Sequence, residues 1–210
     1  MKSKGIIILI IVLFLTGLWY LTTRLIQPKL PEINQPVPDT TEVTVREQDP
    51  YRGLRNAPIT LIVFSSFTCQ ACAQSSEVLD QLLALYPQKL KIVWKDLPSD
   101  LNLAQTAAIA ARCSQQQGKF WQYHDELYKE QANLSAETFN QIAVGLGLNQ
   151  EIFNRCLSGQ QTLPLVQYGL QDATQAGVNN VPFFMLNNGQ QIEGYFSLNS
   201  WRQIIDSMVL

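Results

Sequence analysis

The residues best suited to chemistry are two cysteines three positions apart, Cys69 and Cys72, which end the stretch LIVFSSFTCQAC. A thiol at the start of a helix faces unpaired backbone N–H groups and the positive end of the helix dipole, and both favour the thiolate. A thiol one turn later can attack a mixed disulfide formed at the first. The spacing therefore predicts a catalytic dithiol. Gln70 and Ala71, both uncharged, adjoin the Cys69 sulfur and are expected to tune its redox strength.

Two other interpretations of the pair are a structural disulfide and half of a zinc site. Zinc would need two further ligands. The candidates are Cys113, Cys156 and the single histidine, His124, and none of these forms a second close pair. No metal site is therefore predicted, and His124 is expected to be a packing or helix-surface residue.

A proline in the stretch NNVPFF supports a redox site. Pro182 enters a predicted strand, where a proline removes a hydrogen-bond donor. A cis Val181–Pro182 bond facing Cys69 would leave the Val181 backbone free to pair with an extended substrate. Val181 and Pro182 are therefore predicted to bind substrate, although an ordinary trans proline at a strand start is the alternative.

The elements around these residues are predicted by hydrophobic periodicity. Residues 58–64 are apolar on both faces, as a covered central strand requires. A helix follows from Cys69 to Pro87, and residues 89–98 alternate as a second strand. The right-handed crossover rule makes these two strands parallel.

The rest of the chain is predicted to be helical from about residue 100 to 175, with caps at Ser135 and Asn149. Residues 181–196 predict a hairpin, and a closing helix presents one apolar face. The order β-α-β, helices, β-β-α is an α/β class, the thioredoxin fold with an all-helical insertion.

Residues 1–50 differ from this domain in their pattern of apolar and polar residues. Residues 5–22 begin with an uncharged apolar run preceded by Lys2 and Lys4, which predicts a single transmembrane signal anchor with residues 1–4 in the cytoplasm. A cleaved signal peptide and a buried core helix are the alternatives. Residues 23–50 are polar and proline-rich and predict a tether, which leaves residues 51–210 as an extracytoplasmic domain in which disulfides can persist.

Composition excludes one class of partner. The formal net charge is −2, and no run of Lys and Arg is interleaved with aromatic residues. A nucleic-acid partner is therefore not expected.

With these residues identified, the chain from about Asp49 onward resembles the DsbA-like thiol-disulfide oxidoreductases of bacterial envelopes. The motifs that carry the resemblance are DPYRGLRNAPITLIVFSSFTCQAC, VWKDLP, AARCSQQQGKFWQYHDELY and GVNNVPFF. The resemblance implies that Cys69 is the nucleophile, Cys72 the resolving cysteine and Pro182 the cis-proline. It also favours a structural Cys113–Cys156 disulfide, with two unpaired buried cysteines as the alternative.

The expected activity is exchange of the Cys69–Cys72 disulfide with cysteine-containing secreted or envelope proteins. The protein is expected to act as an oxidase and as a monomer at the bacterial cytoplasmic membrane, without a cofactor. A membrane partner would reoxidise it. A reductase or isomerase with the same pair, served by a reducing partner, and a non-catalytic anchored peptide-binding module are the alternatives.

Two departures from the family pattern concern the surroundings of the pair. The intervening dipeptide is Gln-Ala rather than a pair of the Pro-His type. The position six residues before Cys69, where thioredoxin-like proteins often carry a buried acid, is Val63. Lys95, in the second strand, is either a remnant of a charged partner or an exposed strand lysine.

Overall fold

A computed structural model describes residue 16 and residues 43–209 of the chain. The chain divides into two compact units, residues 1–38 and 39–210. Apart from Thr16, the expected anchor at 5–22 lies outside the described residues, as does the expected tether as far as residue 42. Among the helices of the described part, none has the length and apolar character needed to cross a bilayer.

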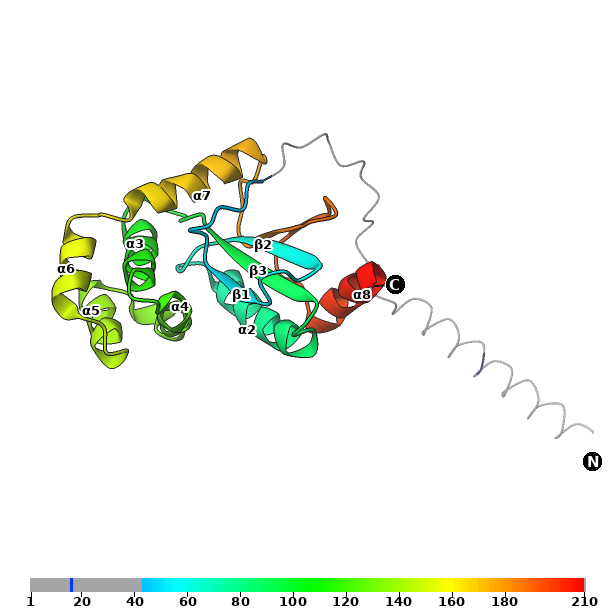
Figure 1. The fold of residues 1–210 in the computed structure, drawn as a ribbon, viewed down its shortest axis with the longest axis horizontal. Coiled ribbons are helices and arrows are strands. Elements are labelled where there is room, and N and C mark those ends of the chain that lie inside the picture. The colour runs from blue at the N-terminus through cyan, green and yellow to red at the C-terminus, as the bar shows by residue number, and fades with distance from the viewer. Residues whose placement is uncertain (1–15, 17–42, 210) are drawn as a thin grey trace, which may run out of the picture. The chain divides into compact units, whose positions relative to one another are not determined.

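A five-stranded mixed sheet forms the centre of the second unit (Figure 1). Its strand order is β1-β3-β2-β4-β5, in which β2 and β3 are parallel and the other pairs are antiparallel. The strands are β1 (Tyr51–Gly53), β2 (Ile59–Ser65), β3 (Leu90–Asp96), β4 (Phe183–Leu186) and β5 (Gln191–Glu193). The predicted parallel pair and hairpin are confirmed, whereas the short edge strand β1 was not predicted.

The two faces of the sheet are covered by different helices, because side chains alternate along the central strands. One face of β2, with Leu61 and Val63, packs with α2 (Gln70–Leu85) and α8 (Leu198–Val209). The other face, with Ile62 and Phe64, packs with the end of α7 (Leu163–Gln175). The covered central strand that the sequence predicts is therefore present.

A group of helices is inserted between β3 and β4 and lies at one end of the sheet (Figure 1). It comprises α3 (Leu103–Gln115), α4 (Phe120–Lys129), the 3-10 turn η1 (Gln131–Asn133), α5 (Ala136–Gly145), α6 (Gln150–Ser158) and α7. Both predicted caps are present: the Ser135 hydroxyl accepts from the Thr138 N–H, and the Asn149 side chain accepts from the Ile152 N–H. The predicted helical insertion is confirmed.

The predicted boundary between tether and domain, at residues 50 and 51, is too late. The Lys95 ammonium donates to the Thr44 carbonyl at 2.7 Å and pairs with Asp49 and Asp172. Arg46 also pairs with Asp172. This segment has no apolar periodicity, but its charged and backbone groups satisfy buried partners. Of the two interpretations of Lys95, that of an exposed strand lysine is wrong, because its side chain is buried and paired.

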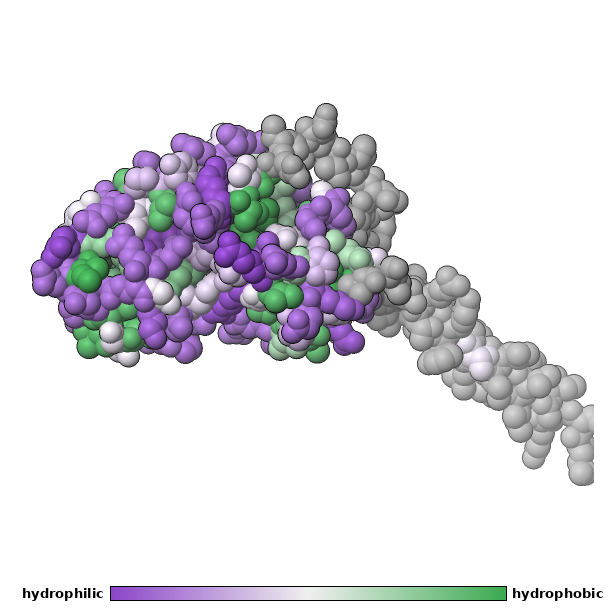
Figure 2. Space-filling model, viewed as in Figure 1, coloured by the Kyte–Doolittle hydropathy of each residue, from purple (hydrophilic) through white to green (hydrophobic). Residues whose placement is uncertain are grey.

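The surface of the domain is more hydrophilic than the buried clusters on the two faces of the sheet. Figure 2 shows hydrophilic residues over most of the face in view, with hydrophobic residues in small separate areas. Most large apolar side chains of the described domain belong to the two clusters on either side of the sheet. The chain leaves the sheet at the end of β2, at Ser65, and enters α2 at Gln70 after a short loop.

Candidate active site

Cys69 occupies the N-cap position of α2. Its backbone is extended, and its sulfur accepts a hydrogen bond from the Cys72 N–H at 3.1 Å. The first turn of α2 contains no acidic residue. A negative charge on the sulfur would therefore be stabilised by the Cys72 N–H and by the helix dipole, and no carboxylate in that turn would oppose it.

Cys69 and Cys72 form a disulfide across this first turn, with their Cα atoms 5.2 Å apart. Cys69 is partly exposed, whereas Cys72 is only 1% exposed. Gln70 is exposed and Ala71 partly exposed, so both lie at the surface beside the bond. An incoming thiolate can therefore reach the sulfur of Cys69 but not that of Cys72.

The segment before β4 lies against the reactive sulfur. The Val181–Pro182 peptide bond is cis, and the Val181 carbonyl oxygen lies 3.6 Å from Cys69 Sγ. Val181 is partly exposed and Pro182 is buried. The fold thus brings the two predicted parts of the site together across more than a hundred residues. A role of Val181 and Pro182 in substrate binding stays a prediction.

A glutamine of the insertion holds the active-site loop, and the sequence did not indicate it. Gln131 Nε2 donates to the carbonyl oxygens of Phe67 at 2.8 Å and Cys69 at 3.0 Å. On the other side of the loop, the hydroxyls of Thr68 and Ser99 are 2.8 Å apart. One glutamine in a polar turn carries no pattern that would distinguish it from its neighbours.

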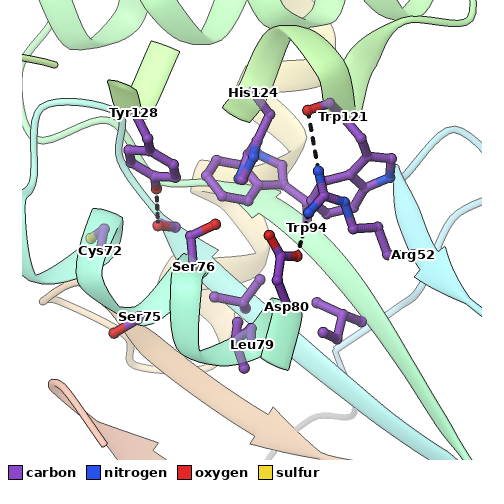
Figure 3. A pocket seen from close by; sticks show the side chains of 13 residues that line it. Arg52, Cys72, Ser75, Ser76, Leu79, Asp80, Trp94, Trp121, His124 and Tyr128 are labelled. Atoms are coloured by element: carbon purple, nitrogen blue, oxygen red, sulfur yellow. Dashed lines mark hydrogen bonds and ion pairs between the residues drawn. The ribbon is translucent and has the colours of Figure 1, made fainter. Parts of the chain in front are cut away.

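A small cavity lies behind the buried sulfur of the pair (Figure 3). Cys72 and Val63 line it, together with His124 and Tyr128 of α4. His124 is 2% exposed and packs edge-on against Trp94, with ring centroids 4.8 Å apart. Burial lowers the pKa of His124 and raises the pKa of Tyr128. Both groups are therefore neutral near pH 7, and His124 packs in the core as expected.

The other two cysteines are distant in sequence from this site. Cys113 of α3 and Cys156 of α6 are bonded to each other, with Cα atoms 5.8 Å apart, and both side chains are fully buried. All four cysteines of the chain are thus in disulfides. Within residues 43–209, no three His, Cys, Asp or Glu side chains are grouped to hold a metal ion.

Comparison with known proteins agrees with this geometry. A family model described as thioredoxin matches residues 45–207. A thioredoxin-like oxidoreductase from Silicibacter pomeroyi superposes with a TM-score of 0.69 at 20% identity, over 78% of this chain and 94% of that one. The thiol-disulfide exchange protein alpha-DsbA2 from Wolbachia pipientis also gives 0.69 at 20% identity, over 77% and 88%. At 20% identity, these superpositions show that the chains share a fold.

The curated relatives are longer proteins. Na(+)/H(+) antiporter NhaA 3 of Salinispora tropica is 30% identical over 156 residues, which are 73% of this chain and 24% of that protein. The chain spans about a quarter of the length of these curated relatives. This match concerns one segment of those proteins.

The fold and the Cys69–Cys72 disulfide define a thioredoxin-like protein, with the disulfide at the start of α2 and a helical insertion in the chain between β3 and β4. The chain belongs to the thioredoxin family, because that family's model matches most of its length.

Proposed function

We propose that this protein is a membrane-anchored thiol–disulfide oxidoreductase that acts as an oxidase and donates its Cys69–Cys72 disulfide to secreted or envelope proteins. The observation that carries the proposal is the position of Cys69, whose partly exposed sulfur caps α2 above a buried Cys72. A thiolate stabilised there stabilises the reduced protein, and a stabilised reduced form makes the disulfide a stronger oxidant.

The proposed reaction moves two electrons from substrate to protein. A substrate thiolate attacks Cys69 Sγ, the Cys69–Cys72 bond breaks, and its electron pair leaves on the Cys72 sulfur. A second substrate thiolate then attacks the substrate sulfur of the mixed disulfide and releases the Cys69 thiolate. The substrate leaves oxidised, and a membrane partner takes the two electrons from the protein. No cofactor is required by these steps.

The proposed location is the outer side of the bacterial cytoplasmic membrane, with residues 5–22 as the anchor. The uncharged apolar run in this segment supports it. The Cys113–Cys156 disulfide supports an oxidising compartment, because structural disulfides are rare in reducing ones. Alkaline extraction of membranes and protease accessibility of intact spheroplasts test this location. A chain that is extracted, or that is protected from protease, contradicts it.

The direction of electron flow is tested by the reduction potential of the full chain, equilibrated with glutathione redox buffers. An oxidase is expected to approach the value of about −120 mV that strong oxidants show, whereas a value near the −270 mV or so of thioredoxin indicates a reductase. A potential in the lower range would overturn the proposed direction.

Catalysis itself is tested by two matched substitutions. Cys69→Ser should abolish disulfide transfer to a reduced peptide. In Cys72→Ser, the Cys69 thiolate should attack the disulfide of an oxidised peptide, release one peptide sulfur as a thiol and remain trapped as a mixed disulfide with the other. A Cys69→Ser protein that still binds peptide and supports the same cellular phenotype would indicate a non-catalytic peptide-binding module instead.

A further inference from the structure

The cavity behind Cys72 has a volume of about 20 Å³ and lies among β2, β3, α2 and α4 (Figure 3). A cavity holds one water molecule when roughly 10–15 Å³ is open to the centre of that molecule. Cys72, Ser75 and His124 contribute to its wall. The cavity, which Cys72 and His124 both line, is therefore large enough for one water molecule.

One buried hydroxyl on the wall of this cavity lacks a protein partner. Ser75 is 1% exposed, and its Oγ makes no hydrogen bond to any of the described residues. Buried hydroxyls are almost always satisfied by protein or by ordered water. Ser75 lies one turn of α2 from Cys72 and lines the same cavity, so a water that satisfied its hydroxyl would be held close to this turn of the helix.

The imidazole on the same wall is oriented as a base. His124 Nδ1 lies 2.8 Å from Asp125 Oδ1, and Asp125 is in turn paired with Arg52. A carboxylate at Nδ1 holds the proton on that nitrogen and leaves the lone pair on Nε2. The His124–Asp125 hydrogen bond therefore selects a neutral tautomer that can accept a proton at Nε2.

The charged groups around His124 are few. They are Asp125 of α4, Arg52 of β1 and Asp80 of α2, and Arg52 is paired with both carboxylates. The remaining neighbours are aromatic rings, from Phe67, Trp94, Phe120, Trp121 and Tyr128. His124 is thus kept neutral by desolvation, while the Arg52 bridge fixes the carboxylate that orients it.

The reaction requires a proton acceptor near Cys72. When the mixed disulfide at Cys69 is resolved, the Cys72 thiol must lose its proton before its sulfur attacks. Val63 lines the cavity with an apolar side chain and cannot accept that proton. Asp80 also lines it but lies at its exposed rim in a pair with Arg52.

We propose that His124 is the proton acceptor for Cys72, through water held at Ser75 in this cavity. The proposal rests on the thiol–disulfide exchange described above. The Cys72 proton passes to His124 Nε2, the Cys72 sulfur attacks Cys69 Sγ, and the Cys69–partner bond breaks with its electron pair on the partner sulfur. In the opposite direction the same path returns a proton to the departing Cys72 thiolate. His124 accepts the proton through the water and does not itself contact the reacting sulfurs.

The test separates the two steps of oxidation by glutathione disulfide in the full chain. Mixed-disulfide formation at Cys69 is bimolecular, and its resolution by Cys72 is unimolecular. His124→Gln should slow only the resolution step, by about 10²-fold at pH 7, which is the lower end of the contribution of a positioned base. It should also move the pH profile of that step to higher pH, an effect that lost packing alone would not produce.

Two further variants keep the test decisive if His124→Gln does not fold. Ser75→Ala removes the hydroxyl, and Asp125→Asn removes the carboxylate that orients the imidazole. Both should slow resolution with the same alkaline shift. Unchanged resolution in these variants would overturn the proposal.

A competing route is tested by Tyr128→Phe. The Tyr128 hydroxyl lies 2.8 Å from Ser65 Oγ on the same cavity wall. This variant should change resolution less than twofold, and a loss as large as that of His124→Gln would assign the proton to the hydroxyl pair instead. A wild-type chain that releases no glutathione would contradict the proposed function itself, whereas an active wild type with an unaffected His124→Gln contradicts only the role of His124.

Discussion

Gln131 donates a hydrogen bond of 3.0 Å from its side-chain amide to the carbonyl oxygen of Cys69. The same nitrogen donates to the Phe67 carbonyl at 2.8 Å. Gln131 belongs to the helical insertion, and the two carbonyls belong to the loop that delivers the nucleophile. The insertion therefore does more than enlarge the domain, because it fixes the backbone on which the reactive sulfur is carried.

Replacement of Gln131 by alanine should loosen this loop. Two partly buried carbonyl oxygens lose their donor, and the oxidised protein should lose about 1–2 kcal/mol of stability. Its rate of exchange with a reduced peptide should also fall, because Cys69 is less well positioned. Urea unfolding and single-turnover exchange measure the two effects. Gln141→Ala is the matched control, since Gln141 is exposed and, among the described residues, its side chain donates to Glu137. Equal effects of the two variants would contradict the role of Gln131.

The two disulfides should respond differently to reductant. Cys69 is partly exposed at a helix terminus, whereas Cys113 and Cys156 are fully buried. Mild dithiothreitol under native conditions should reduce the first pair and leave the second intact, as thiol alkylation and mass spectrometry would show. Reduction of both pairs at similar rates would contradict this expectation.

Removal of the buried disulfide should destabilise the domain without changing its chemistry. The bond closes a separation of 43 residues, for which the chain-entropy model gives about 4 kcal/mol. A Cys113→Ala, Cys156→Ala double variant should unfold at lower denaturant concentration and keep the wild-type reduction potential. A changed potential would mean that the insertion disulfide is coupled to the active site.

The parts of the site that the sequence could predict are those set by local rules. Strand periodicity placed β2, the helix start placed Cys69, and the proline pattern pointed to Pro182. Ser135 and Asn149 were recognised because caps have characteristic residue types next to a helical period. These features depend on neighbours along the chain, and each therefore appears in a short stretch of sequence.

Contacts between distant polar groups were not predictable in the same way. Lys95 alternates with apolar residues in its strand and was therefore open to an exposed interpretation, although its partners are Asp49 and Asp172. Nothing in the sequence distinguishes Gln131 or Ser75 from neighbouring helix residues. Only the fold brings Gln131 against the active-site loop and Ser75 to the wall of the cavity. Their roles depend on tertiary packing, which no periodicity encodes.

The buried position of Lys95 leads to a stability prediction. Lys95→Met keeps the length of the side chain but leaves the carboxylates of Asp49 and Asp172 in the interior without their shared partner. Breaking such a buried pair costs about 3–5 kcal/mol. Lys91→Met is the matched control, because Lys91 lies in the same strand and is partly exposed. Denaturant unfolding of both variants tests the difference, and similar stabilities would contradict a structural role for the Lys95 cluster.

The same cluster should make the domain sensitive to acid. Burial opposes ionisation of Asp172, but its hydrogen bonds with Arg46 and Lys95 prevail and hold the pKa below the ordinary value of 3.8. A carboxyl with a depressed folded pKa contributes stability that is complete above the unfolded pKa and is lost as pH falls through the folded one. The free energy of unfolding should therefore drop steeply below about pH 4. Asp172→Asn should be less stable at pH 7 but should show a flatter decline in this range.

Protonation of His124 should cause a second decline in the free energy of unfolding, at a higher pH than the decline caused by Asp172. Burial lowers its pKa below 6.5, so the unfolded chain binds a proton that the folded domain does not. By the same linkage, stability should begin to fall as pH drops below about 6.5. Urea unfolding from pH 8 to pH 3 should show this step in the wild type, and His124→Gln should lack it while the decline below pH 4 remains. A wild-type curve that is flat between pH 7 and pH 5 would show that His124 is protonated equally in the folded and unfolded chain.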